Sequence, residues 1–294
     1  MNYYNPDGLA KHRPNKRECL KKIFTKIKDS LSTSRLTKIE YITFGGSDFA
    51  DLHDLASSLQ GGKIRIASVI SFENDARTFE LAQNSPTADL LRIFGQKIKV
   101  IHNSFPDGLN RSKRPPRCQR VFFLDYFGTF DEENALHLAE LLDSRDILPD
   151  DWLIITSCLD GRVVKNERFI TKHVGRCQLF FQMPNPSKDF VVRNFVDTMV
   201  KLAIDTHRKI QPRDYCVKAN LVSKYYYADT TPMGVWCFKL EKCVSSNEPI
   251  YLVDMNFTRI GAKKKKVASR FRRRIISRGP RIINRSISRL FPSR

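Results

Sequence analysis

The sequence lacks the features that mark a membrane, secreted or metal-binding protein. It has no run of about 18 apolar residues that could span a bilayer. Residues 1–20 lack the apolar core of a signal peptide, so we expect a cytoplasmic protein. The seven cysteines are odd in number and none is spaced as C-x-x-C, which argues against a disulfide framework or a zinc site. We therefore expect no bound metal.

Acidic residues are also too few to balance the basic ones. There are 31 Asp and Glu against 51 Lys and Arg, and the formal net charge is +20. Residues 261–294 contain 13 of the basic residues and no acid. Such a surplus predicts a polyanionic partner, RNA or DNA first and an anionic membrane surface as the alternative. Two further basic groups are Lys11, Arg13, Lys16, Arg17, Lys21, Lys22, Lys26, Lys28 and Arg111, Lys113, Arg114, Arg117, Arg120.

The basic tail, taken as residues 259–294, has two dense charge clusters. We expect these side chains to contact phosphates without reading sequence. Ile and Leu residues recur between positions 275 and 290, so an amphipathic helix on an anionic membrane remains open, as does a solvated tail. The expected contact residues are Lys263, Lys264, Lys265, Lys266, Arg272, Arg273 and Arg274.

What is present is an alternation of short apolar segments with helical patterns. Apolar runs predict strands, and three- and four-residue spacing predicts helices. The pattern predicts an α/β fold, a Rossmann-like, doubly wound and mostly parallel sheet with a C-terminal antiparallel hairpin. We expect a basic helical extension (1–36), one main domain (37–258) and the tail. The expected strands are 39–44, 64–72, 98–102, 121–124, 152–156, 217–227, 235–240 and 250–255, and the helices include 18–32, 49–59, 131–142 and 190–207.

Polar and glycine residues follow the first four predicted strands. A sheet of this kind binds its ligand at the carboxyl ends of its strands, where glycine permits close backbone approach. The acid after the second strand could accept hydrogen bonds from ribose hydroxyls. The residues at these ends, in strand order, are Gly45, Gly46 and Ser47; Glu73; Asn103 and Ser104; and Asp125 with Tyr126 and Phe127.

Three segments carry a resemblance to a known family. Residues 71–76 (Ser-Phe-Glu-Asn-Asp-Ala) and 122–129 (Phe-Phe-Leu-Asp-Tyr-Phe-Gly-Thr) resemble the acidic and fourth motifs of class I S-adenosylmethionine-dependent methyltransferases. Residues 148–156 are similar to the turn and strand that follow the family's fourth helix. The resemblance covers roughly residues 37–242. The chain departs from the family at Thr43, which stands where an acid is usual, at Ser47 in place of a glycine, and at Tyr126 in place of a proline.

The resemblance implies S-adenosylmethionine as cofactor. Gly45, Gly46 and Ser47 would then approach its methionine part, Glu73 its ribose, and Asn103 and Ser104 its adenine. Asp125, Tyr126 and Phe127 would face the target. The leading hypothesis is a methyltransferase acting on RNA or DNA. Two alternatives stay open: a non-catalytic nucleic-acid-binding protein on a degenerate methyltransferase fold, and a methyltransferase of small molecules or proteins.

Overall fold

The computed structural model divides the chain into two units, Met1–Gly261 and Ala262–Arg294, and describes residues of the first. None of the described helices is long and apolar enough to cross a membrane. The described residues are 13–32, 37–44, 49–59, 64–73, 75–84, 97–102, 114–126, 128–143, 150–159, 166–210, 216–229, 231–243 and 255–261.

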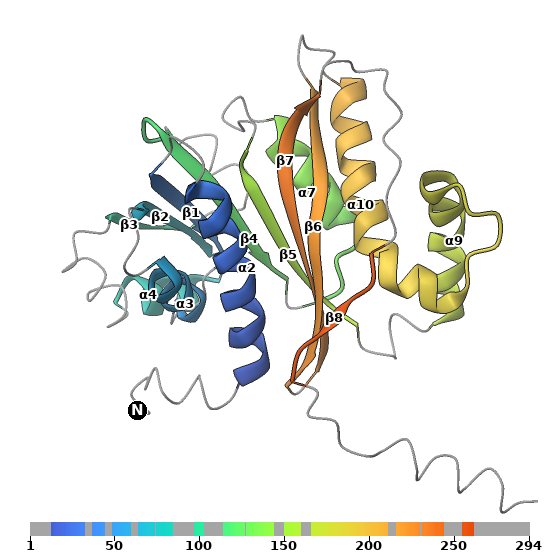
Figure 1. Ribbon diagram of the computed structural model, residues 1–294, viewed down its shortest axis with the longest axis horizontal. Coiled ribbons are helices and arrows are strands. Elements are labelled where there is room, and N and C mark those ends of the chain that lie inside the picture. Colours follow the sequence, from blue (N-terminus) through green and yellow to red (C-terminus); the bar gives the residue numbers. More distant parts are fainter. Residues whose placement is uncertain are drawn as a thin grey trace, which may run out of the picture. The chain divides into compact units, whose positions relative to one another are not determined.

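An eight-stranded sheet runs through the first unit in the order β3-β2-β1-β4-β5-β7-β6-β8 (Figure 1). Strands β1 to β5 pair in parallel, whereas β7 is antiparallel to both β5 and β6. The predicted fold class and its closing hairpin are therefore confirmed. The strands are β1 (Lys38–Thr43), β2 (Arg65–Glu73), β3 (Lys97–His102), β4 (Cys118–Asp125), β5 (Trp152–Cys158), β6 (Cys216–Ala228), β7 (Pro232–Cys243) and β8 (Thr258–Arg259).

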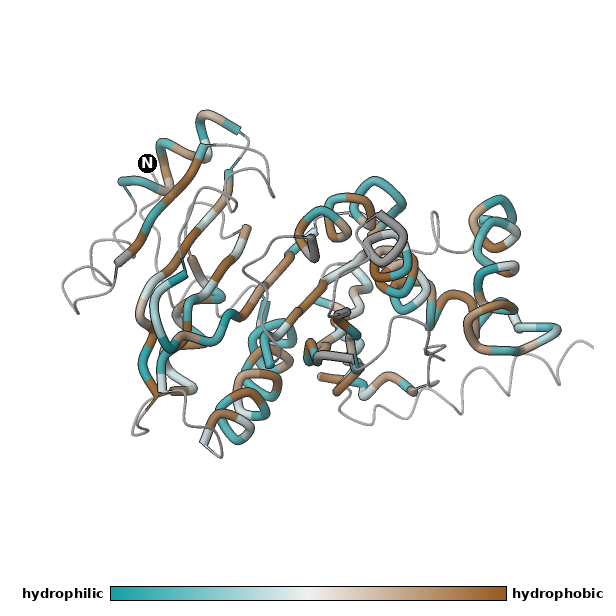
Figure 2. Tube along the Cα trace, turned by 90° about the horizontal axis from the view of Figure 1, so that it is seen from above, coloured by the Kyte–Doolittle hydropathy of each residue, from teal (hydrophilic) through white to brown (hydrophobic). Residues whose placement is uncertain are grey.

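Helices cover both faces of the sheet, which explains why the central strands are apolar without polar alternation. Helices α2 (Pro14–Ser32), α3 (Ala50–Leu59) and α4 (Ala76–Gln83) pack on one face, and α7 (Glu132–Asp143) and α10 (Lys188–Ile210) on the other. Figure 2 shows hydrophobic residues along the strands, whereas the helices alternate hydrophobic and hydrophilic residues.

Successive residues of the central strands enter opposite cores. Tyr41 and Phe123 belong to the core under α2 and α3, and Ile42 and Phe122 to the core under α7 and α10. Because side chains alternate along a strand, Asp125 at the end of β4 is in phase with Phe123 and lies on the α2 side. This places its carboxylate under the first turn of α2.

Helix α2 begins earlier than its apolar spacing predicts, at Pro14 rather than Glu18. Proline suits the first turn because its missing N–H would have no partner there. Five apolar side chains recur at three- and four-residue steps along the helix and all are buried, so they form its inward face: Leu20, Ile23, Phe24, Ile27 and Leu31.

Three features differ from the sequence predictions. The strand expected at 121–124 begins earlier, since β4 starts at Cys118, and the side chain of Arg120, one of the basic group, is buried 2.5 Å from Glu40. Arg114 pairs with Asp151. Helix α9 (Glu167–Phe181), which packs on α10, was not predicted. Of the strand expected at 250–255, only residue 255 is described and it is not in a strand; the last strand is β8.

Candidate active site

The carboxyl ends of the parallel strands meet at one edge of the sheet. Thr43 ends β1, Glu73 ends β2 and Asp125 ends β4. Strands β2 and β4 flank β1. Since neighbouring strands are about 4.8 Å apart, the ends of β2 and β4 lie about 10 Å apart. The structure therefore brings the two acids predicted from the sequence to the same edge.

The carboxylate of Asp125 is held from two sides. Lys16 Nζ of α2 lies 2.5 Å from Oδ2, and Thr156 Oγ1 of β5 donates to Oδ1 at 2.5 Å. The side chains of Lys16 and Asp125 are only 14% and 15% exposed, so their attraction is weakly screened by water. Lys16 also lies over the ring of Phe123, 5.7 Å from its centroid.

A cavity of about 140 Å³ opens beside Asp125. It lies between the end of β4, the first turn of α2 and the turn that joins β6 to β7. Tyr126 packs edge-on against Phe44 and Phe130, with centroid distances of 5.5 and 5.2 Å. Its buried Oη has no hydrogen-bond partner among the described residues. The lining residues are Arg13, Lys16, Asp125, Tyr126, Tyr227, Asp229, Thr231 and Met233.

The β6–β7 turn fixes the start of α2 at this cavity. Asp229 accepts hydrogen bonds from the backbone N–H groups of Asn15 and Lys16, both at 3.1 Å. Asn15 also donates from its side chain to the carbonyl of Ala228 at 3.2 Å. A carboxylate at a helix N-terminus satisfies otherwise unpaired N–H groups and interacts favourably with the helix dipole. Asp229 thereby positions Lys16 over Asp125.

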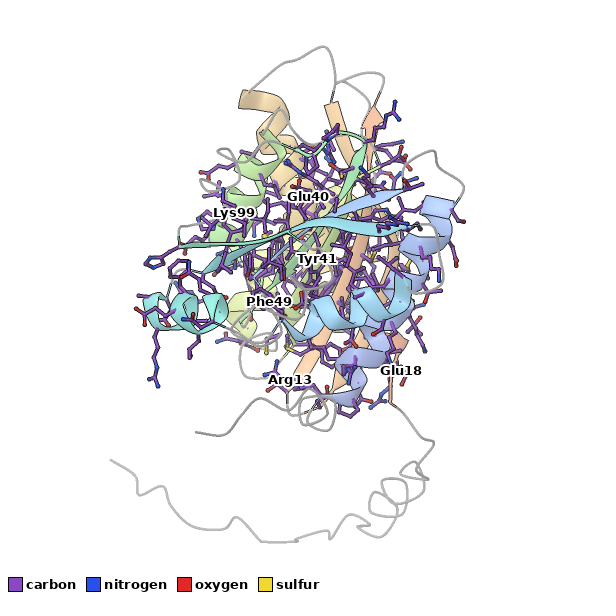
Figure 3. All side chains as sticks on the ribbon, turned by 90° about the vertical axis from the view of Figure 1, so that its left-hand side faces the viewer. Arg13, Glu18, Glu40, Tyr41, Phe49 and Lys99 are labelled. Carbon is purple, nitrogen blue, oxygen red and sulfur yellow. The ribbon has the colours of Figure 1, made fainter. Side chains whose placement is uncertain are left out.

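A further carboxylate, not singled out from the sequence, lies at the end of β1. Asp51 of α3 accepts hydrogen bonds from Tyr41 Oη at 2.6 Å and Thr43 Oγ1 at 2.9 Å. Burial raises the pKa of Asp51, and these bonds and the charge of Lys16 oppose the rise. Tyr41 and Phe49 lie between the sheet and α3 (Figure 3). Asp51 thus places a buried acid beside Thr43 at the end of β1.

Glu73 is half-buried at the end of β2 and is aligned with His102 at the end of β3. The His102 ring stacks on Phe79 of α4, with centroids 5.0 Å apart. Helix α4 starts at Asp75, which accepts a hydrogen bond from the Thr78 N–H at 2.7 Å. An acid and an aromatic pair therefore lie together at the edge where the sequence predicts ribose and adenine contacts.

Several of the predicted site residues lie outside the described part of the chain. The roles predicted for these residues therefore remain predictions. They are Gly45, Gly46, Ser47, Asn103, Ser104, Phe127, Lys263, Lys264, Lys265, Lys266, Arg272, Arg273 and Arg274. Among the described residues, no three His, Cys, Asp or Glu side chains come together as metal ligands.

No protein-family model matches the chain, and no curated protein matches its sequence. Solved structures do resemble it. A protein from Listeria monocytogenes named as a class I S-adenosylmethionine-dependent methyltransferase is 11% identical, with a TM-score of 0.45 over 88% of this chain and 70% of that one. The plantazolicin methyltransferase BpumL in complex with SAH is 10% identical, with a TM-score of 0.39 over 78% of this chain and 86% of that one. An O-methyltransferase from Bacillus cereus in complex with SAH is 13% identical, with a TM-score of 0.37 over 74% of this chain and 80% of that one. Likeness at this level concerns the fold and does not define the reaction.

Proposed function

We propose that this chain is an S-adenosylmethionine-dependent methyltransferase. The observation that carries the proposal is the placement of Glu73 and Asp125 at strand ends on either side of β1, with a cavity beside Asp125. Sheets of this kind bind nucleotide-like ligands at this edge. When bound, the cofactor supplies a methyl group on a sulfonium sulfur, which leaves with the electron pair of the broken bond.

The described residues fit such a cofactor. Glu73 offers a half-buried carboxylate for ribose hydroxyls. On the other side of the edge, Lys16 and Asp125 form a charged pair that can bind an acceptor and move its proton. Catalysis then requires mainly that the two reactants be held in the correct orientation.

Calorimetric titration with S-adenosylhomocysteine tests the cofactor part. The unmodified chain should bind, and Glu73→Ala should weaken binding roughly ten- to a hundredfold because it removes hydrogen bonds to a charged group. Glu80→Ala is the matched control, since Glu80 is an exposed acid on α4. If the unmodified chain does not bind, the methyltransferase proposal is wrong and the non-catalytic alternative takes its place.

The nucleic-acid acceptor predicted from charge has less support than the cofactor. Five of the basic residues behind that prediction pair with acids of the chain itself: Lys16 with Asp125, Arg17 with Asp54, Lys22 with Glu18, Arg114 with Asp151 and Arg120 with Glu40. Paired charges attract phosphates less than free ones. The cavity instead favours the small-molecule alternative, and nucleic-acid binding rests on the tail, whose expected role is location.

A further inference from the structure

The cavity beside Asp125 has the size and walls of a site for one aromatic ring. Its volume, about 140 Å³, is close to the roughly 150 Å³ that holds benzene in an engineered protein cavity. Tyr227 and Met233 supply a ring and a thioether, and such groups make favourable contacts with aromatic ligands. The apolar part of a ligand is thus specified by these two side chains.

The charged end of the cavity specifies the ligand's polar group. An ammonium group has three donors, and the described contacts of Lys16 Nζ use one of them, on Asp125. Both Asp125 oxygens are engaged, by Lys16 and by Thr156. A ligand oxygen near Lys16 would therefore receive a charge-assisted hydrogen bond, with a carboxylate next to it to accept a proton.

The same charges disfavour other ligand classes. A protonated amine would be repelled by the Lys16 ammonium. A phosphate would face two carboxylates, Asp125 and Asp229, which line the cavity together with the cations Arg13 and Lys16. A hydroxyl that ionises carries a single negative charge, which these carboxylates repel less than the double charge of a phosphate. The charged groups around Lys16 are Asp125 of β4, Arg13 and Asp229 at the cavity wall and, at longer range, Asp51 of α3.

We propose that this cavity binds the methyl acceptor, and that the acceptor is a small molecule with one aromatic ring and a hydroxyl group, which Lys16 holds as its anion. The inference rests on the proposed methyltransferase function. The hydroxyl proton passes to Oδ2 of Asp125 when the acceptor binds, and Lys16 stabilises the negative charge that this leaves on the oxygen. In the reaction, this oxygen bonds to the methyl carbon and the carbon–sulfur electron pair stays on sulfur.

The test uses 4-nitrophenol, whose hydroxyl ionises near neutral pH and whose ionised form absorbs visible light. The full chain, without cofactor, is titrated with the probe at several pH values. The ionised probe should bind about tenfold or more tightly than the neutral one, because an opposite charge within hydrogen-bonding distance favours the anion. The absorbance of the bound probe reports its ionisation directly and requires no catalytic turnover.

Two variants and one control test whether the probe binds in this cavity and whether Lys16 favours its ionised form. Lys16→Met should lose the preference for the ionised probe, because Asp125 and Asp229 then repel it, while Lys22→Met, the same change on an exposed part of α2, should behave as the unmodified chain. Thr231→Trp at the β6–β7 turn should fill the cavity and abolish binding of both forms. Thermal unfolding of each variant checks that it is folded, and Thr231→Trp tests the site even if Lys16→Met is unstable.

The inference is overturned if the unmodified chain shows no saturable binding, if both forms bind equally, or if Thr231→Trp binds as well as the unmodified chain. Parallel calorimetry with S-adenosylhomocysteine separates this inference from the function on which it rests. If S-adenosylhomocysteine binds but 4-nitrophenol does not, the proposed acceptor class is wrong and the methyltransferase proposal stands. If 4-nitrophenol binds with the expected dependence on Lys16 but S-adenosylhomocysteine does not bind, the ligand class of the cavity stands and the methyltransferase proposal is wrong.

Discussion

Lys224 carries its ammonium group into the interior between β6 and α10. The side chain is fully buried, and Nζ lies 2.8 Å from Asp197, 2.5 Å from Asn194 Oδ1 and 3.2 Å from the carbonyl of Arg193. Asp197 also accepts a hydrogen bond from Trp236 Nε1 at 3.1 Å. Removing one partner of such a pair leaves an uncompensated buried charge, which is costly.

Lys224→Met should therefore lower the free energy of unfolding by about 3–5 kcal/mol. Urea denaturation measures the change. Lys188→Met is the control, since Lys188 is 69% exposed and its ion pair with Glu167 is long, so it should change stability by less than about 0.5 kcal/mol. Combining Lys224→Met with Asp197→Leu should recover much of the loss; a double variant that is no more stable than the single one contradicts this account.

His173 of α9 is buried against Phe169 and Phe195, with ring centroids 4.4 and 5.9 Å away. Burial, helped by the charges of Arg176 and Lys172 and opposed by Glu132, lowers the pKa of His173 from 6.5 to about 4. The unfolded chain then takes up a proton at higher pH than the folded chain. The stability that this histidine contributes is therefore present above pH 6.5 and is lost as the pH falls to 4.

The expected loss across that window is about 3 kcal/mol at most, at about 1.4 kcal/mol for each pH unit. His173→Phe keeps an aromatic ring in place and should remove this part of the pH dependence. Urea denaturation of both proteins at steps between pH 4 and 7 gives the difference. The contact with Lys172, helped by Arg176, lowers the pKa of the neighbouring Glu132 to about 2, and because Glu132 is present in both proteins its own pH dependence cancels in the difference. Equal pH dependence in the two proteins would refute the assignment.

At the scale of elements, the β6–β7 turn and α2 act as one unit through Asp229. Asp229→Ala should lower the free energy of unfolding by about 0.5–2 kcal/mol, the usual effect of removing a helix N-terminal acceptor. It should also weaken 4-nitrophenol binding, because Lys16 loses the contact that fixes its backbone. Asp229→Asn retains one acceptor and should lie between the two proteins in both measurements. If Asp229→Ala lowers stability but leaves 4-nitrophenol binding unchanged, Asp229 caps the helix without positioning Lys16 for the ligand.

Most elements could be predicted because their signal is local. Buried strands of a parallel sheet appear as short apolar runs, and α2 appears as an apolar stripe. Helix α9 has comparable spacing at Ile170, Val174 and Cys177 and a capping Asn166, so its signal was present in the sequence. Strand β8 has two residues and forms through pairing with β6, so no local pattern could predict it.

The site residues likewise divide into those with a local sequence signal and those without one. Glu73 and Asp125 could be located because strand ends can be read from the sequence. Lys16 and Asp229 could not, because their contacts join residues 109 and 213 positions apart. Nothing in the composition of α2 distinguishes Lys16 from the other lysines of that helix. The pairing depends on how α2 crosses the sheet, which is a property of the packed molecule.

At the scale of the whole molecule, charge separates the chain into two parts. The first unit neutralises many of its basic residues internally, whereas residues 261–294 have 13 basic residues and no acid. We predict that this tail, which the structure describes only as far as Gly261, binds RNA or DNA through phosphate contacts. Affinity should fall with salt at a logarithmic slope of about −0.7 per phosphate contacted on a single strand, or about −0.9 on a duplex.

Filter binding at several salt concentrations, with the full chain and a chain lacking residues 263–294, measures this. Deletion should weaken binding to all sequences alike, because phosphate contacts carry little sequence information. It should leave binding of S-adenosylhomocysteine and 4-nitrophenol unchanged, since Glu73 and Lys16 belong to the folded unit. If both chains bind nucleic acid equally weakly but only the full chain binds anionic vesicles, the isoleucine-rich part of the tail is a membrane anchor. The positive charge would then locate the chain at a lipid surface, and the nucleic-acid prediction would be wrong.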